Sequence, residues 1–229
     1  MQLAKSKNLV SVRVIRKIGA RYAQDYIQRF GFEPEKHPPY LTMALGAGSV
    51  TPLQLATGYG VFANGGYRVE PYLISKVLDA KGNVLFEATP QKSGDSQLKV
   101  LDSRTAFVMD SLLQEVTKTG TAASARPALG RSDIAGKTGT TNESMDAWFA
   151  GYHPNIVAVA WIGFDKPKSL GDRETGGGLA LPMWTRYMKT ALSGMPESPR
   201  TPPPGVSQQD GDWVIPEFVP FLGRTTVLE

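Results

Sequence analysis

Cysteine is absent from this chain of 229 residues, and histidine occurs only at His37 and His153. The lack of cysteine excludes disulfides, thiolate nucleophiles and zinc–thiolate sites. Each histidine stands directly before a proline, so we expect both in turns and not in a catalytic triad or a metal cluster. The composition therefore predicts neither a metal site nor a cofactor.

Long apolar segments are missing as well. No run approaches the roughly 20 residues that span a bilayer, and the first residues lack the charged, apolar and small-residue zones of a signal peptide. Lysine and arginine exceed aspartate and glutamate by only 25 to 21 and are scattered, so the pI near 9.2 gives little support for a nucleic-acid partner. A hydrophobic fraction of 41% predicts a globular chain with a substantial core.

Apolar spacing and end signals predict several helices. The first covers 8–30, and a second opens with the capping hydroxyl and first-turn proline of Thr51-Pro52. Another is capped by Asp102, and the last begins near Pro182 and ends before Gly194. The residues expected to pack inward are Leu9, Val12, Ile15, Ile18 and Tyr22 in the first helix and Leu53, Leu55, Ala56, Tyr59 and Phe62 in the second.

Extended segments predict an antiparallel sheet. Residues 67–87 have the pattern of a strand, a turn and a second strand, which together form a hairpin. Three more extended segments follow at Ile134–Gly139, Ala147–Tyr152 and Ile156–Phe164, and the short connections between them favour antiparallel pairing. An antiparallel sheet flanked by helices makes an α+β domain.

The remaining stretches predict loops and a tail. Residues 89–99 and 119–131 are expected to be loops. Residues 195–229 hold seven of the 17 prolines, so we expect an extended or loosely docked tail after a domain at 1–194.

The segment Gly136-Lys137-Thr138-Gly139-Thr140-Thr141 combines a fixed cation, a glycine and clustered hydroxyls beside a predicted strand. This chemistry favours binding of an anion such as a carboxylate at a sheet edge. A phosphate-binding loop is excluded, because Gly130 stands one residue too far from the Gly-Lys-Thr and a strand, not a helix, follows. The near-copy Lys118-Thr119-Gly120-Thr121 follows a helical pattern, so we interpret it as a helix end and loop.

Two motifs and their surroundings resemble the penicillin-binding D,D-transpeptidases of the bifunctional class A type. Lys137-Thr138-Gly139 matches the Lys-Thr-Gly signature of these relatives of the serine β-lactamases, and Ser6-Lys7-Asn8, 131 residues earlier, matches their Ser-x-Asn signature. The other stretches typical of their transpeptidase domain are 45–52, 62–67, 146–152 and 176–182. The resemblance covers about 190 residues and implies the penicillin-binding transpeptidase and serine β-lactamase-like fold.

The resemblance also implies catalytic roles for Ser6, Asn8 and Lys137. A serine nucleophile would attack the bond between two terminal D-alanines of a peptidoglycan stem peptide, and an amine of a neighbouring stem would accept the acyl group. Ser6 and Lys137 would hold or relay the proton bound for the leaving amine, and Asn8 would orient the substrate amide.

Substrate binding is implied at Thr138, Gly139 and Thr140. The two hydroxyls would receive the terminal carboxylate, and the backbone N–H of Thr140 would supply half of the oxyanion hole. Glycine at the position between them would let the substrate backbone lie close. β-Lactams mimic the D-alanyl-D-alanine terminus, so the same groups are expected to bind them.

The family's Ser-x-x-Lys nucleophile motif should precede Ser6, and the chain begins just before that residue. The one match, Ser96-Gln97-Leu98-Lys99, comes after Ser6 and in a polar stretch, so we interpret it as a surface loop. We therefore expect the C-terminal part of a longer enzyme, incomplete at its N-terminal side and inactive alone. The upstream half would add the nucleophile, a glycosyltransferase domain and an anchor in the bacterial inner membrane, facing the periplasm.

Alternative functions remain open at this point. The same pocket would suit a non-acylating sensor that recognises peptidoglycan or β-lactams, or a D-alanyl-D-alanine carboxypeptidase. A serine β-lactamase is disfavoured, because Asp146–Tyr152 is typical of transpeptidases and Lys7 stands where many lactamases carry an acid.

Overall fold

A computed structural model describes residues 2–219 of the chain. The helices are α1 (Asn8–Ile18), α2 (Ala20–Ile27), α3 (Pro52–Ala63), α4 (Ser103–Lys118), α5 (Ala125–Leu129) and α6 (Leu181–Ala191). The strands are β1 (Lys76–Leu78), β2 (Val84–Glu87), β3 (Ala135–Thr140), β4 (Ala147–His153), β5 (Ile156–Ile162), β6 (Ser207–Gln209) and β7 (Asp212–Val214). Within 2–219, no helix has both the length and the apolarity needed to cross a membrane.

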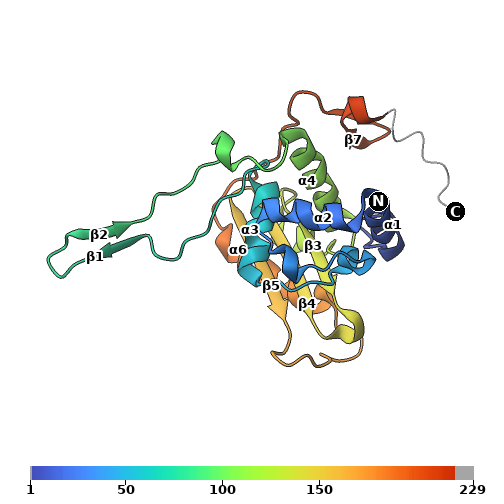
Figure 1. Ribbon diagram of the computed structural model, residues 1–229, viewed down its shortest axis with the longest axis horizontal. Coiled ribbons are helices and arrows are strands. Elements are labelled where there is room, and N and C mark those ends of the chain that lie inside the picture. The colour runs from blue at the N-terminus through green and yellow to red at the C-terminus, as the bar shows by residue number, and fades with distance from the viewer. Residues whose placement is uncertain (1, 220–229) are drawn as a thin grey trace.

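The central sheet has the order β3-β4-β5, and all its pairs are antiparallel as predicted. Side chains on β4 alternate between the two faces. Phe149 packs edge-on against Trp184 of α6 with ring centroids 4.8 Å apart, whereas Tyr152 lies 6.4 Å from Tyr59 of α3. The sheet is therefore covered by α6 on one face and α3 on the other (Figure 1), which confirms the α+β fold class.

The predicted helix over 8–30 is divided at Gly19. This residue has φ of 90°, a left-handed conformation that an α-helix interior cannot contain, and it separates α1 from α2. Ile15 is buried, but Leu9 and Tyr22 are 74% and 58% exposed. The predicted single helix with one buried face was wrong, because Gly19 divides it into two helices and, within α1 itself, Ile15 is buried whereas Leu9 is exposed.

The starts of α3 and α4 confirm the capping signals. Thr51 and Gln54 form a reciprocal capping box, in which the Thr51 hydroxyl accepts from the Gln54 N–H at 3.1 Å. The Asp102 carboxylate caps α4 by accepting from the Arg104 N–H at 3.0 Å. The inward face of α3 was only partly predicted, because Leu53 is exposed.

Residues 125–129 form α5 inside the stretch predicted as a loop. This helix has little more than one turn and ends at Gly130, whose φ of 63° is left-handed. A segment of this length contains too few positions to show helical periodicity, so the sequence pattern missed it.

The hairpin predicted within 67–87 is present as β1 and β2, and it projects far from the rest of the protein at the left of Figure 1. Every residue of both strands is exposed. An ion pair of 2.8 Å between Lys76 and Glu87 joins the strands across the hairpin.

Two buried carboxylates fasten the beginning of the predicted tail. Asp110 of α4 pairs with Arg200 at 3.1 Å, and Asp133 accepts from the Ser198 N–H at 2.7 Å. A buried carboxylate needs such partners. The beginning of the tail is therefore held to the domain by charged groups, whereas the sequence predicted an extended or loosely docked tail. The tail then forms the β6–β7 hairpin, and its last ten residues, 220–229, lie outside the described residues.

Candidate active site

A direct hydrogen bond joins the two motifs of the sequence analysis. Lys137 lies on β3, the edge strand of the central sheet, and its Nζ donates to the Ser6 hydroxyl at 2.8 Å. The same Nζ donates to the Thr138 carbonyl at 2.9 Å. Ser6 is exposed and Lys137 is half-buried, so the pair lies at the protein surface with the ammonium partly covered.

Ser6 precedes α1 and is not its cap, since Lys7 occupies the N-cap position. Its φ of 51° is in the left-handed region, which is unfavourable for a residue other than glycine. The Ser6 N–H donates to the Leu3 carbonyl at 3.0 Å, and the Lys7 N–H donates to the Gln2 carbonyl at 3.2 Å, which holds the turn in this conformation. Asn8 opens α1 close by and is exposed.

Burial lowers the pKa of Lys137 below the ordinary lysine value. The ammonium loses hydration in the half-buried position, which disfavours its charged form. Its two hydrogen bonds go to a neutral hydroxyl and a backbone carbonyl. The result is a lysine that gives up a proton more readily than an exposed one and that holds a hydroxyl within transfer distance.

The two threonines of the Lys-Thr-Gly-Thr segment face away from Lys137. Thr138 is paired with Phe149 on β4, and Phe149 faces α6, so Thr138 and Thr140 lie on the α6 side of the edge strand. The Thr140 hydroxyl accepts from the Gly176 N–H at 3.0 Å. The hydroxyl proton of Thr140 therefore remains free to be donated to a ligand.

The backbone of the glycine-rich turn before α6 approaches β3 very closely. A Cβ added to Gly176 would lie 2.4 Å from the Gly139 carbonyl oxygen and 2.3 Å from the Trp148 carbonyl oxygen. Only glycine fits between these two backbone groups. Glycine is thus required at position 176 by packing against the edge strand.

Sequence reasoning missed one residue beside this site. Thr121, in the loop after α4, places its hydroxyl oxygen 2.6 Å from that of Thr138. The only signal was the repetition of Lys-Thr-Gly-Thr in that loop, which was interpreted as a helix end. Lys118 and Thr119 do terminate α4, but Thr121 reaches β3.

Ser96 lies outside this group, as expected. It is exposed and opens a short 3-10 turn that the Asp95 carboxylate caps. A nucleophile needs a lysine one helical turn away on a long helix, and this turn of three residues provides none.

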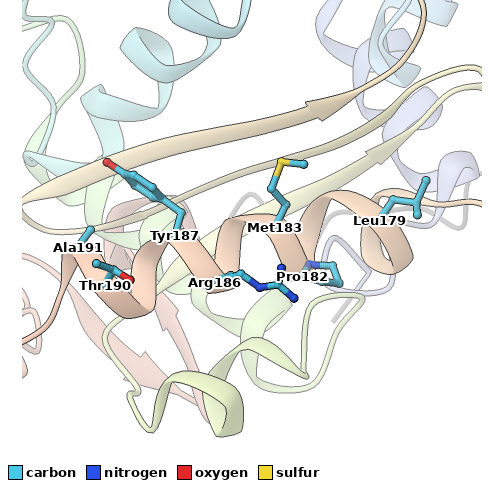
Figure 2. A pocket seen from close by; sticks show the side chains of 7 residues that line it. All are labelled: Leu179, Pro182, Met183, Arg186, Tyr187, Thr190 and Ala191. Carbon is cyan, nitrogen blue, oxygen red and sulfur yellow. The ribbon is translucent and has the colours of Figure 1, made fainter.

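A separate hollow lies along α6. It has a volume of about 820 Å³ and follows the outer side of α6, where Met183 and Tyr187 are 52% and 57% exposed (Figure 2). Arg186 is the only charged residue in its lining. The hollow contains none of the motif residues, so the candidate site is the surface group around Lys137 and not this groove.

Comparison with known sequences agrees with the motif geometry. The model of the penicillin-binding protein transpeptidase domain matches residues 1–188. Penicillin-binding protein 1A of Neisseria lactamica is 48% identical over 217 residues, which is 95% of this chain, and the protein of the same name from Pseudomonas aeruginosa is 39% identical over 89% of it. The chain spans only 27% and 30% of these relatives.

Solved structures give the same result. The crystal structure of penicillin-binding protein 1A from Haemophilus influenzae covers 91% of this chain with a TM-score of 0.84 and 35% identity, and the chain covers 36% of it. PonA1 of Mycobacterium tuberculosis, solved in complex with penicillin V, covers 87% with a TM-score of 0.68 and 25% identity, and the chain covers 56% of it. The chain therefore belongs to the penicillin-binding protein transpeptidase domain family.

Proposed function

We propose that this chain forms one side of the active site of a peptidoglycan D,D-transpeptidase, which cross-links stem peptides through a serine acyl-enzyme. The hydrogen bond between Lys137 and Ser6 carries this proposal. It joins two residues 131 positions apart and leaves a hydroxyl beside an ammonium whose pKa is lowered, at the surface. That pair is suited to passing a proton to a leaving amine.

The proton transfer follows from the direction of the hydrogen bond. The nucleophile gives its hydroxyl proton to a base of the upstream part of the protein, its oxygen bonds to the carbonyl carbon of the penultimate D-alanine, and the peptide C–N bond breaks. The departing nitrogen then takes the proton of the Ser6 hydroxyl, and Ser6 recovers a proton from Lys137 Nζ, which already donates to it. The lowered pKa of Lys137 makes this donation easier. Asn8, at the start of α1, would orient the substrate amide.

We further propose that the substrate's terminal carboxylate is bound by Thr138 and Thr140, beside Gly139. The Thr140 hydroxyl oxygen accepts from the Gly176 N–H, so the proton of the Thr140 hydroxyl is available to the anion. The Thr141 N–H donates toward β4, to the Asp146 carbonyl, and N–H directions alternate along a strand. The Thr140 N–H would therefore point to the open edge, where it can serve as half of an oxyanion hole.

The nucleophile in this proposal comes from outside these 229 residues, because Ser96 does not fit the role. The relatives are more than three times as long as the part that this chain matches, which leaves room for a nucleophile helix, a glycosyltransferase domain and a membrane anchor. With them, the protein would act on the periplasmic face of the bacterial inner membrane. The transpeptidase domain would end near Gly194, and 195–229 would be a tail whose beginning is held to it by Ser198 and Arg200.

The test is covalent labelling with a fluorescent penicillin. We expect the full-length protein to form an acyl adduct and the isolated chain to form none. Binding without an adduct in the full-length protein would favour the non-acylating sensor, and an adduct on Ser96 would contradict the assignment. With a D-alanyl-D-alanine peptide and an added amine acceptor, formation of the acyl-transfer product supports a transpeptidase, whereas hydrolysis alone indicates a carboxypeptidase.

A further inference from the structure

The near-copy Lys118-Thr119-Gly120-Thr121 ends beside Lys137-Thr138-Gly139-Thr140. Thr121 closes the copy in the loop after α4, and its hydroxyl oxygen is 2.6 Å from the hydroxyl oxygen of Thr138 on β3. Thr138 is half-buried and Thr121 is exposed, so the pair is at the surface. Thr138 follows Lys137 directly on the edge strand β3 and faces its other side.

Two other parts of the chain hold the backbone around Thr121. Its N–H donates to the carbonyl of the buried Ala4 at 3.1 Å, and a Cβ added to Gly120 would lie 2.3 Å from that same oxygen. On the other side, a Cβ added to Gly177 would lie 3.2 Å from the Thr121 carbonyl oxygen. The turn that contains Ala4 also carries Ser6, so Thr121 is held between that turn and the glycine-rich turn before α6.

We propose that Thr121 is a positioning residue for the substrate carboxylate. A hydroxyl has one proton to donate, and a pair of hydroxyls uses one of its two protons internally. When Thr121 donates to Thr138, the Thr138 proton is directed outward and can be donated to the anion. Each bond in such a chain polarises the next, which strengthens the bond to the carboxylate. This inference rests on the proposed function and adds a residue to it.

A purely structural role for the Thr121 hydroxyl is a weaker explanation. Thr121 is exposed, so replacing it with the isosteric valine leaves no buried polar atom without a partner. The loop is already fixed by backbone contacts to Ala4 and by the close approach of Gly120, and valine keeps both. The hydroxyl therefore matters for what Thr138 does with its own proton.

The experiment measures acylation of the full-length protein by benzylpenicillin and by its methyl ester, which lacks the carboxylate. Thr121→Val should lower the acylation rate constant for the acid about tenfold and leave that for the ester unchanged, since only the acid uses the donated proton. Thr121→Ser should restore the rate with the acid. Thr119→Val, in the same loop with its hydroxyl on Glu115, is the matched control and should behave as the unaltered protein.

The acid-to-ester ratio separates the possible results. Equal losses with both compounds would mean that Thr121 only supports the loop, and no loss with either compound would mean that its hydroxyl is idle. Either result overturns the proposal. Absence of any adduct in the unaltered protein would instead remove the proposed function, and this inference with it.

Discussion

Replacing Lys137 with methionine tests the central pair of the site. Methionine has a similar length and no donor, so the Lys137→Met change removes both the bond to Ser6 and the proton source while filling the same space. The position is half-buried and the pKa of Lys137 is lowered there, so the ammonium contributes little to folding. We expect the variant to keep its thermal stability.

The effect on acylation should be large. A hydrogen bond from a charged donor that acts on the reacting groups contributes about 2 to 4 kcal/mol to the barrier. At about 1.4 kcal/mol per tenfold, this corresponds to a loss of roughly 30- to 1000-fold in the acylation rate constant. The assay is fluorescent penicillin labelling of the full-length protein over time, with the melting temperature measured in parallel.

The chain contains a matched control in its repeated tetrapeptide. Lys118 has the same local sequence, but it is exposed at the end of α4 with only a loose 3.9 Å approach to Glu115. Lys118→Met should therefore acylate at the rate of the unaltered protein. A Lys137→Met variant within about threefold of that rate, where roughly 30-fold is the smallest loss expected, would refute the reasoning.

Further predictions concern packing and charge. Gly176→Ala should destabilise the protein by about 2 kcal/mol or more and slow acylation, since the added Cβ meets two backbone oxygens. Gly178→Ala is the control, because its Cβ meets only a hydroxyl at 3.4 Å, and it should change neither thermal unfolding nor labelling. Arg200→Leu should cost about 3 kcal/mol in urea unfolding, because it strips the buried carboxylate of Asp110 of its cation, and a cost near zero would contradict this. Burial lowers the pKa of His153 despite the nearby carboxylate of Asp133, so His153 binds a proton more readily in the unfolded chain than in the folded one. The free energy of unfolding should therefore fall as the pH drops below about 6.5. A His153→Gln variant should lack that part of the decrease.

The sequence predicted best where one local signal decides a structure. The capping residues Thr51 and Asp102 start their helices as expected, because a cap depends only on the next three residues. The β3–β4–β5 meander followed from short connections. Gly19 and α5 show the limit of such signals, since a glycine that leaves the helical region and a helix of five residues both fall below what periodicity resolves.

The tail shows another limit. Its prolines predicted an extended chain, and its start is indeed without regular structure. Its attachment depends on Asp110 and Asp133, which are far away in sequence and become buried only when the domain folds. No pattern within the tail could reveal that carboxylates elsewhere would need Arg200 as a partner.

The sequence by itself determined the family and the chemical types at the site: a lysine, a serine and threonines in two separated motifs. Only the tertiary structure decided how they meet. The edge position of β3 brings Lys137 within 2.8 Å of Ser6, and the pleat turns Thr138 to the other side of the strand, where Thr121 lies. Motifs record residue types that local chemistry requires, but hydrogen bonds over such separations depend on distances that arise only when the sheet and its loops pack together.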